Sequence, residues 1–575
     1  MNRNPEPLGL KPRKYFDQSL DGNDSREIRK QSKSLLKELI GNTQELVEFI
    51  EKYSELYDMV EDKTLLIFAR YLTNMSSARN IFSIIGYGLR AILPLLKTRT
   101  KSINKIYESE YYSSLPPEYD QLKRLIDSMQ NKKKSMLQAA VEYINVGLYQ
   151  LKIQSCKAEL DGKKLSIPRA IAILKDQDRD KRENAWRAIY GVLLEKKAGF
   201  NKIYSRLLKL RVKKAKKNGF DNCRDYYHHD VKKRFDYTPE DCFKFHDSVE
   251  EVVVPFIKEL NEKKCNVLGI ESMRPWDKIV DPSGKELKPY ESVDDLIKKM
   301  IQIFSKIKRE YGQILGEMYA NDFIDPENRK GKVAGAMSLA LADHRAGYII
   351  ANAVGMDSDV FTIAHEGGHS VHWAAATSIP IAMYHEMMLF PMEVAEVGSM
   401  AMAFLILDHL GEIYDDPEDI KRAKRAKLES AMRSLPYYMT IDRFQHEIYT
   451  NPDHTVDERM VHFRQLVDRF DGAAGVNYDG LENEASAGWL KQTHVFQSPF
   501  YYIEYAIAQL AALGIYKNLR EKGEIAIQQY DDFINLGNSR SLPELYEAAG
   551  VKFDFSTENI KSLTSFVKNE LSNLE

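Results

Sequence analysis

The stretch from Phe361 to Trp373 reads FTIAHEGGHSVHW and carries three of the chain's thirteen histidines. His365 and His369 are four residues apart, so on a helix their Cβ atoms lie about 5 to 6 Å apart on one face. Residues 357–359 can cap the start of a helix, and no proline interrupts the residues that follow. The stretch therefore predicts a helix that presents two imidazoles to one metal ion.

Glu366 completes an HExxH pattern, in which two histidines bind zinc and the glutamate acts as general base toward a water on the metal. About 0.02 chance matches are expected in a chain of 575 residues with thirteen histidines. The alternative is a plain helix whose histidines pack or face solvent. Gly367 and Gly368 weigh against it, because each glycine costs about 0.5 to 1 kcal/mol relative to alanine inside a helix. Their missing side chains would let another backbone, or a substrate, approach the metal face of this helix.

A catalytic zinc site needs a third protein ligand. The segment from Phe390 to Leu410 has the pattern of a second helix and carries Glu393 and Glu396. Such a helix can run back beside the first and supply a carboxylate. Spacing alone does not choose between the two glutamates, and it leaves His372 and His385 as further candidates. The favoured role for His372 is packing or support, because it points away from the face of the other two histidines.

The composition is that of an ordinary soluble globular protein, with 43% apolar and 29% charged residues. The net charge of −2 predicts no nucleic-acid partner and no anionic membrane surface as a partner. Residues 1–24 lack the apolar segment of a signal peptide, and the longest apolar run, Met400–Leu407, is too short to span a membrane. The spacing of the four cysteines indicates neither a disulfide framework nor a thiolate zinc site. A reducing, cytoplasmic location is therefore predicted.

Helical periodicity dominates the chain from Asp24 to about Leu210. The best strand candidate is Ala346–Val354, which is rich in β-branched and aromatic residues and directly precedes the HExxH stretch. No repeat with a period of 20 to 50 residues is visible, which argues against a helical solenoid. We predict an N-terminal helical lobe over residues 1–200 and a catalytic region over residues 201–575.

Several ordered blocks of the chain resemble the thimet oligopeptidase and oligoendopeptidase F family of zinc peptidases, and the oligoendopeptidase F branch above all. The resembling blocks are Gly331–Ala336, Asn352–His372, Glu393–Ser399, Thr493–Ala512 and Phe533–Phe553, with weaker similarity at Leu174–Trp186. Two positions depart from the family pattern. Gly367 stands where relatives often have a larger apolar residue, and Ala403 stands where many carry a second glutamate.

The resemblance implies a role for each matching residue. One zinc ion would be bound by His365, His369 and Glu396, the last because it begins the E-x-x-S block that ends at Ser399. The general base would be Glu366. The family's histidine and tyrosine donors fall within one short segment, in which Tyr501 is also a candidate; the favoured residues are His494, Tyr502 and Tyr505.

The resemblance also implies a fold and an activity. The expected fold is mainly α, with two helical lobes around a deep substrate channel and a small β-sheet near the active site. The expected activity is internal cleavage of short unfolded peptides. The alternatives are a metallocarboxypeptidase or dipeptidase on a related scaffold, and an inactive relative that binds peptides. The oligomeric state is not predicted.

Overall fold

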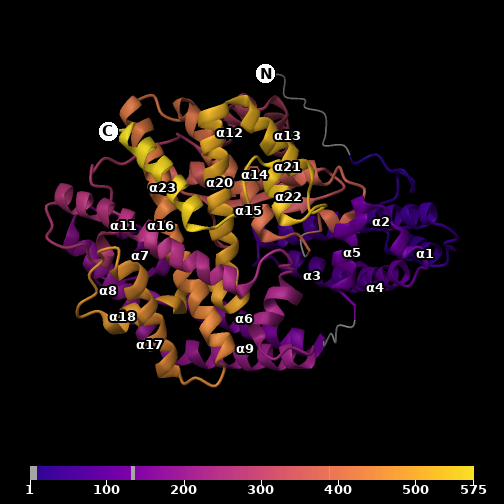
Figure 1. Ribbon diagram of the computed structural model, residues 1–575, viewed down its shortest axis with the longest axis horizontal. Helices are drawn as coiled ribbons and strands as arrows, with labels where there is room; N and C mark the ends of the chain where they lie inside the picture. The colour runs from indigo at the N-terminus through magenta and orange to yellow at the C-terminus, as the bar shows by residue number, and fades with distance from the viewer. Residues whose placement is uncertain (1–9, 131–135, 387–388) are drawn as a thin grey trace. The chain divides into compact units, whose positions relative to one another are not determined.

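The computed structural model describes residues 10–130, 136–386 and 389–575. Most of these residues form α-helices, and the strands among them form two small β-sheets (Figure 1). The prediction of a mainly helical fold with a small sheet is confirmed. Residues 1–9, on which part of the prediction about export rests, lie outside the described residues.

The chain forms two compact units, each assembled from three separate stretches. Unit 1 comprises Met1–Gln130, Leu287–Lys424 and Ala511–Phe553, and unit 2 comprises Asn131–Glu286, Arg425–Leu510 and Asp554–Glu575. The predicted boundary at residue 200 lies inside helix α9 (Lys197–Lys217) of unit 2. The division into an N-terminal lobe and a catalytic region stays a prediction about function.

Unit 1 contains the HExxH stretch. Its helices are α1 (Ser25–Leu35), α2 (Thr43–Thr73), α3 (Ala78–Tyr87), α4 (Leu93–Tyr107), α5 (Asp120–Asp127), α12 (Val293–Ile307), α13 (Arg309–Ala320), α14 (Asp357–Ala376), α15 (Met392–Leu405), α21 (Glu524–Asn535) and α22 (Leu542–Ala548). Two helices, α16 (Pro417–Thr450) and α20 (Tyr502–Lys522), contribute residues to both units.

A three-stranded sheet in unit 1 supports the HExxH helix. Its strands are β3 (Ile324–Glu327), β4 (Met337–Leu341) and β5 (Ala346–Ala353), in the order β3-β5-β4. The central strand β5 pairs parallel with β3 and antiparallel with β4, and α14 packs against it. The predicted strand at Ala346–Val354 is therefore confirmed.

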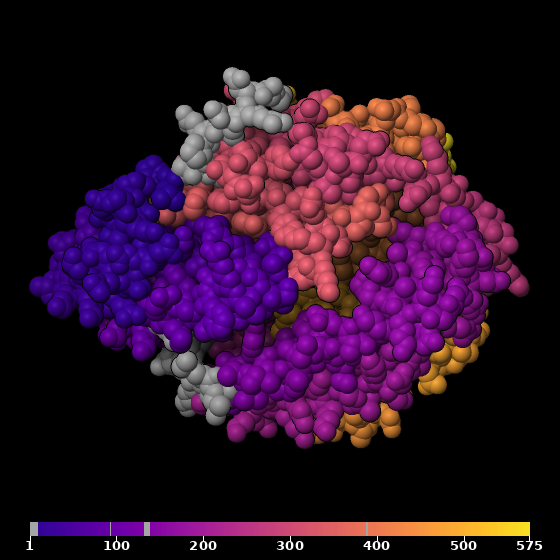
Figure 2. Space-filling model, turned by 180° about the vertical axis from the view of Figure 1, so that it is seen from behind, coloured from indigo at the N-terminus to yellow at the C-terminus, as the bar shows by residue number. Residues whose placement is uncertain are grey.

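The N-terminal helix α2 closes the other side of this sheet. Ala69 and Leu72 of α2 form one buried apolar cluster with Leu339 of β4 and Ile350 of β5. On the surface, the indigo N-terminal residues border the pink residues around the sheet (Figure 2). Segments that are more than 250 residues apart in the sequence thus share one core.

Among the described residues of unit 2, the regular structure is helical apart from one small β-hairpin. Its helices are α6 (Met136–Gln154), α7 (Ile167–Ile173), α8 (Arg179–Glu195), α9, α10 (Cys223–Asp225), α11 (Pro239–Leu268), α17 (Val456–Val467), α18 (Glu482–Ser486), α19 (Thr493–Gln497) and α23 (Thr557–Ser572). Its strands β1 (Lys157–Leu160) and β2 (Lys163–Ser166) pair antiparallel.

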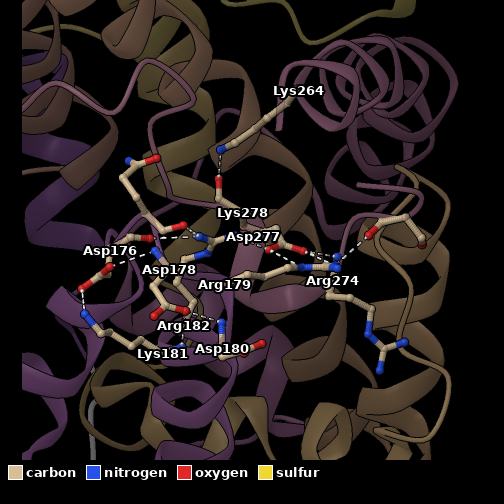
Figure 3. Close-up of polar contacts among 12 residues, drawn as sticks. Asp176, Asp178, Arg179, Asp180, Lys181, Arg182, Lys264, Arg274, Asp277 and Lys278 are labelled. Carbon is tan, nitrogen blue, oxygen red and sulfur yellow. Dashed lines mark hydrogen bonds and ion pairs between the residues drawn. The ribbon is translucent and has the colours of Figure 1, made fainter. Parts of the chain in front are cut away.

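A buried carboxylate organises the start of α8. Asp277 is fully buried and accepts hydrogen bonds from Arg179 at 2.9 Å, from Arg182 at 2.8 Å and from the backbone N–H of Arg274 at 3.0 Å (Figure 3). Burial alone would raise the pKa of Asp277, but the hydrogen bonds from Arg179 and Arg182 lower it below its ordinary value. The two arginines belong to the weakly resembling block Leu174–Trp186, and they tie the start of α8 to the loop that carries Asp277.

Two helical stretches of the described chain are long and apolar enough to cross a membrane: Ala78–Tyr107 and Met392–Glu412. The second is the core helix of unit 1, with 83% of its apolar window buried inside the protein. The first has 24% of its window buried. Length and composition are matched as well by the core helix of a soluble protein, so the absence of a membrane span stays a prediction.

Candidate metal centre

The HExxH stretch forms helix α14, as predicted. One carboxylate oxygen of Asp359, Oδ2, accepts hydrogen bonds from the backbone N–H groups of Val354, Gly355 and Met356 at 2.8, 2.9 and 2.9 Å. These bonds fold the loop after β5 back onto the first turn of the helix. A negative side chain in the first turn also interacts favourably with the helix dipole. The start of α14 is thereby fixed against the sheet.

Helix α15 runs beside α14 and brings its backbone onto Gly368 (Figure 1). A Cβ atom on Gly368 would lie 2.7 Å from Met402 Cβ, 2.9 Å from the carbonyl oxygen of Gly398 and 2.9 Å from Ser399 Cα. These separations are shorter than van der Waals contact, so only glycine fits. The predicted approach of another backbone is confirmed at Gly368, and that backbone is α15.

Gly367 faces a different neighbour. A Cβ atom there would lie 2.7 Å from Cζ of Phe304 in α12 and 3.5 Å from Leu315 Cδ2 in α13. Both glycines are buried. Gly367 therefore makes room for core side chains of unit 1, and the two glycines serve the packing of three helices around α14.

Three side chains from α14 and α15 converge. His365 Nε2 lies 3.4 Å from Glu396 Oε2, and His369 Nε2 lies 3.8 Å from the same oxygen. One ligand atom from each of the three residues falls within 4.8 Å of the other two. The imidazole rings have centroids 4.8 Å apart and are nearly perpendicular. Of the alternatives that spacing left open, the structure selects Glu396 as the third member of this group.

The donor set fits a zinc-type ion. Ligand bonds of about 2.0 to 2.2 Å in a tetrahedron place ligand atoms about 3.3 to 3.6 Å from one another, close to the separations observed. Burial lowers the pKa of His369 to about 4, so its imidazole is neutral near pH 7 and can donate a lone pair. Ser399 Oγ donates to Glu396 Oε2 at 3.3 Å and orients the carboxylate.

Glu366 is buried beside this group. Its Oε2 atom has no hydrogen-bond partner among the described residues. Burial, and then the negative charge of Glu396, raise the pKa of Glu366 well above its ordinary value. An unsatisfied buried carboxylate with a raised pKa is typical of a general base in a catalytic site.

The other candidate ligands lie elsewhere. His385 is buried, with Nε2 2.8 Å from Asp58 Oδ1, and Glu393 is outside the converging group. His372 is fully buried among aromatic rings, with centroids 5.3 Å from Phe390 and 5.4 Å from Phe533. Burial, and then His369, lower the pKa of His372 to about 3, which keeps it uncharged. The favoured packing role for His372 agrees with this environment.

A sequence model of peptidase family M3 matches residues 172–565. The chain belongs to peptidase family M3. This finding, together with curated oligoendopeptidase F relatives, confirms the predicted resemblance.

Two curated relatives illustrate the relationship. The chain is 26% identical over 294 residues to the oligoendopeptidase F homolog of Borreliella burgdorferi, covering 50% of this chain and 48% of that one. It is 23% identical over 412 residues to the chromosomal oligoendopeptidase F of Lactococcus lactis subsp. cremoris, covering 70% and 65%. The alignments thus span about half to two thirds of these relatives' length.

The fold also matches a solved structure of PZ peptidase A with an inhibitor. The TM-score is 0.86 at 22% identity, and the match covers 97% of this chain and 99% of that chain. The mainly helical M3 fold with its small sheet is therefore shared over nearly the whole chain.

The predicted histidine and tyrosine donors belong to unit 2. The ring of His494 has its centroid 4.9 Å from Tyr501, 5.6 Å from Tyr502 and 5.9 Å from Tyr505. Tyr502 Oη donates to Gln492 Oε1 at 3.0 Å. The structure therefore brings His494 and the tyrosines together as one aromatic cluster.

The charge states of this cluster suit hydrogen-bond donation. Burial raises the pKa of Tyr502, so its hydroxyl keeps its proton near pH 7. Burial, and then the positive charge of Lys232, lower the pKa of His494, which favours its neutral form. A neutral imidazole and a neutral phenol each offer one proton to an acceptor.

The two glycines of α14 respond differently to a methyl group. Gly368→Ala is expected to lower the free energy of unfolding by about 2 kcal/mol, because the new Cβ meets the fixed backbone of α15. Gly367→Ala is the matched control and costs less, because its Cβ meets the end of the Phe304 ring and alanine gains about 1 kcal/mol in helix propensity. Urea unfolding of both variants measures the difference. Equal losses would contradict the close approach at Gly368.

Proposed function

We propose that the protein is a zinc-dependent endopeptidase that hydrolyses short unfolded oligopeptides. The observation that carries the proposal is the convergence of His365 Nε2, His369 Nε2 and Glu396 Oε2 next to the buried carboxylate of Glu366. Membership of peptidase family M3 supports a peptidase activity. The curated relatives named oligoendopeptidase F support internal cleavage of short peptides.

His365, His369 and Glu396 would hold the zinc ion. When bound, zinc supplies Lewis-acid chemistry, because it polarises a peptide carbonyl and lowers the pKa of a water molecule from about 15.7 toward 7. Two imidazoles and one carboxylate make three protein ligands, the number that catalytic zinc sites use. Ser399 keeps the carboxylate of Glu396 in its binding orientation.

Glu366 would move the proton. Its unpartnered Oε2 accepts the proton of the attacking water, and its raised pKa lets it hold that proton. The same oxygen then donates the proton to the nitrogen of the departing amine. One carboxylate thus acts first as base and then as acid.

The tyrosines would stabilise negative charge on the substrate. We assign His494, Tyr502 and Tyr505 as hydrogen-bond donors to the oxygen that becomes negative as the carbonyl is attacked. The raised pKa of Tyr502 supports this role, since only a protonated hydroxyl donates. Its present bond to Gln492 Oε1 would be exchanged for one to the substrate.

Peptide cleavage tests the proposal directly. The purified protein, loaded with zinc, is expected to cleave internal bonds of short peptides whether or not their ends are blocked, and a chelator is expected to abolish cleavage until zinc is restored. Mass spectrometry of the products identifies the cleaved bonds. Products that appear only from unblocked peptides would indicate a carboxypeptidase or dipeptidase. No cleavage of any peptide would indicate an inactive peptide-binding relative.

The same proposal includes the protein's surroundings. We place it in the cytoplasm or another reducing compartment, which is supported by four buried cysteines, all in the described chain and none in a disulfide. The balanced charge supports small peptides as partners in preference to nucleic acid or a membrane surface.

A further inference from the structure

A second group of metal-ligating side chains lies in unit 2, on helices α11 and α16. Cys242 and His246 are four residues apart on α11, and Asp442 and His446 are four residues apart on α16. This spacing turns both side chains of each pair to the same face of their helix. All four are buried, with at most 2% of their surface exposed.

The ligand atoms of this group lie close together. Asp442 Oδ2 is 3.0 Å from His246 Nε2 and 3.1 Å from His446 Nε2. One ligand atom each from Cys242, Asp442 and His446 falls within 4.8 Å of the other two. Tetrahedral zinc with a bond of about 2.3 Å to sulfur and about 2.0 to 2.1 Å to nitrogen needs ligand separations of about 3.3 to 3.6 Å. A small adjustment therefore accommodates an ion.

The hydrogen bonds around this group are incomplete. His446 Nε2 contacts Asp442 Oδ2 at 3.1 Å, whereas His446 Nδ1 has no hydrogen-bond partner in the described parts of the chain. The same holds for Asp442 Oδ1 and for His246 Nδ1. Buried polar atoms are nearly always paired, so several unpaired ones around a single carboxylate call for a bound partner.

A metal cation is the partner whose chemistry fits. Cys242 offers a sulfur, Asp442 a carboxylate oxygen and His446 an imidazole nitrogen to the same small space. A buried carboxylate is tolerated when it is paired or coordinates a metal. Thiolate and imidazole ligands favour zinc over magnesium or calcium.

We propose that Cys242, Asp442 and His446 form a second, non-catalytic metal site that takes a zinc-type divalent cation. His246 is a positioning residue, because its Nε2 hydrogen-bonds to Asp442 and fixes the carboxylate. The ion would join α11 to α16 within unit 2 and stabilise the packing of those two helices. This inference does not depend on the proposed peptidase activity, since the site has no residue in common with it.

Cobalt provides a test that separates the two sites. The full-length protein is stripped of metal, titrated with Co²⁺ and followed by absorption spectroscopy and by metal analysis. Two cobalt ions per chain are expected, with a sulfur-to-cobalt charge-transfer band in the near ultraviolet. The band reports on a thiolate ligand, because the group of His365, His369 and Glu396 contains no sulfur.

Matched variants assign the band. Cys242→Ser is expected to remove it, whereas Cys265→Ser, on the same helix, keeps it. His369→Leu should lose one cobalt ion and keep the band, and His246→Ala should weaken cobalt binding at the thiolate site by about 10 to 100-fold. A wild-type protein that takes up cobalt without the band would overturn the inference, as would a band that survives in Cys242→Ser. Either result would leave a metal-free network of Asp442 and two histidines.

Discussion

Glu366→Gln is expected to lower peptide turnover by about 10³-fold while the bound metal is retained, because loss of a general base typically costs 10² to 10⁴-fold. Glutamine has nearly the same shape as glutamate. It also replaces a buried carboxylate, one of whose oxygens has no hydrogen-bond partner among the described residues, by an uncharged amide. The folded state is therefore preserved, while the group that accepts the water proton is lost. The measurement is kcat on a quenched fluorescent peptide, with metal content determined on the same preparation.

Glu393→Gln is the matched control for this substitution. Glu393 is also a buried glutamate of unit 1, but it lies outside the converging group. We expect the peptide turnover of Glu393→Gln to stay within a few-fold of the turnover of the parent protein. Full activity of Glu366→Gln would contradict the proposed mechanism, whereas equal losses in both variants would point to a general disturbance of the buried carboxylates.

His369→Leu is expected to remove one metal ion per chain and, with it, nearly all peptide cleavage. His369 is a buried ligand candidate from the middle of α14, and leucine keeps an apolar side chain without a nitrogen donor. A site left with His365 and Glu396 has two protein ligands, fewer than the three of catalytic zinc sites. Metal analysis after dialysis, together with the peptide assay, measures both effects.

His372→Leu, one turn further along the same helix, is the control. Both nitrogens of His372 are buried without a hydrogen-bond partner in the chain as described, and its ring packs among aromatic side chains. Replacing an unpaired buried polar group by an apolar one is nearly neutral or stabilising. The variant should therefore keep its metal. If His372→Leu lost metal and His369→Leu kept it, the assignment of ligands would be wrong.

The features that depend on local spacing were predictable from the sequence. A four-residue interval places His365 and His369 on one face of a helix wherever that helix packs, and α14 forms as expected. The strand β5 was predictable because its β-branched and aromatic residues stand out. Its parallel partner β3 was not, because the sequence Ile-Asp-Pro-Glu contains a proline and little apolar surface.

Features that depend on contacts between distant segments were not predictable. The sequence indicated that something approaches Gly367 and Gly368, but only the tertiary structure shows that Phe304 and α15 do so. Spacing could not choose Glu396 over Glu393, because residues three positions apart on a helix lie on nearly the same face. The choice depends on how α15 is rotated against α14.

The second metal group shows the limit of cysteine spacing as a signal. The spacing of cysteines does not reveal this group, because it contains a single thiol. The signal that was present is the pair of four-residue intervals, Cys242 to His246 and Asp442 to His446. The two intervals are separated by almost 200 residues, so their meeting is decided by the packing of α11 and α16.

The division of each unit into three stretches has a consequence for synthesis on the ribosome. The carbonyl oxygen of Gly398 in α15 accepts a hydrogen bond from Tyr530 Oη at 2.7 Å, and that of Glu393 accepts one from Tyr546 Oη at 3.1 Å. These tyrosines follow their partners by 132 and 153 residues. The helix that carries Glu396 therefore leaves the ribosome well before its packing partners exist. Because domains fold as units, unit 1 can be completed only when the chain has been made to Phe553.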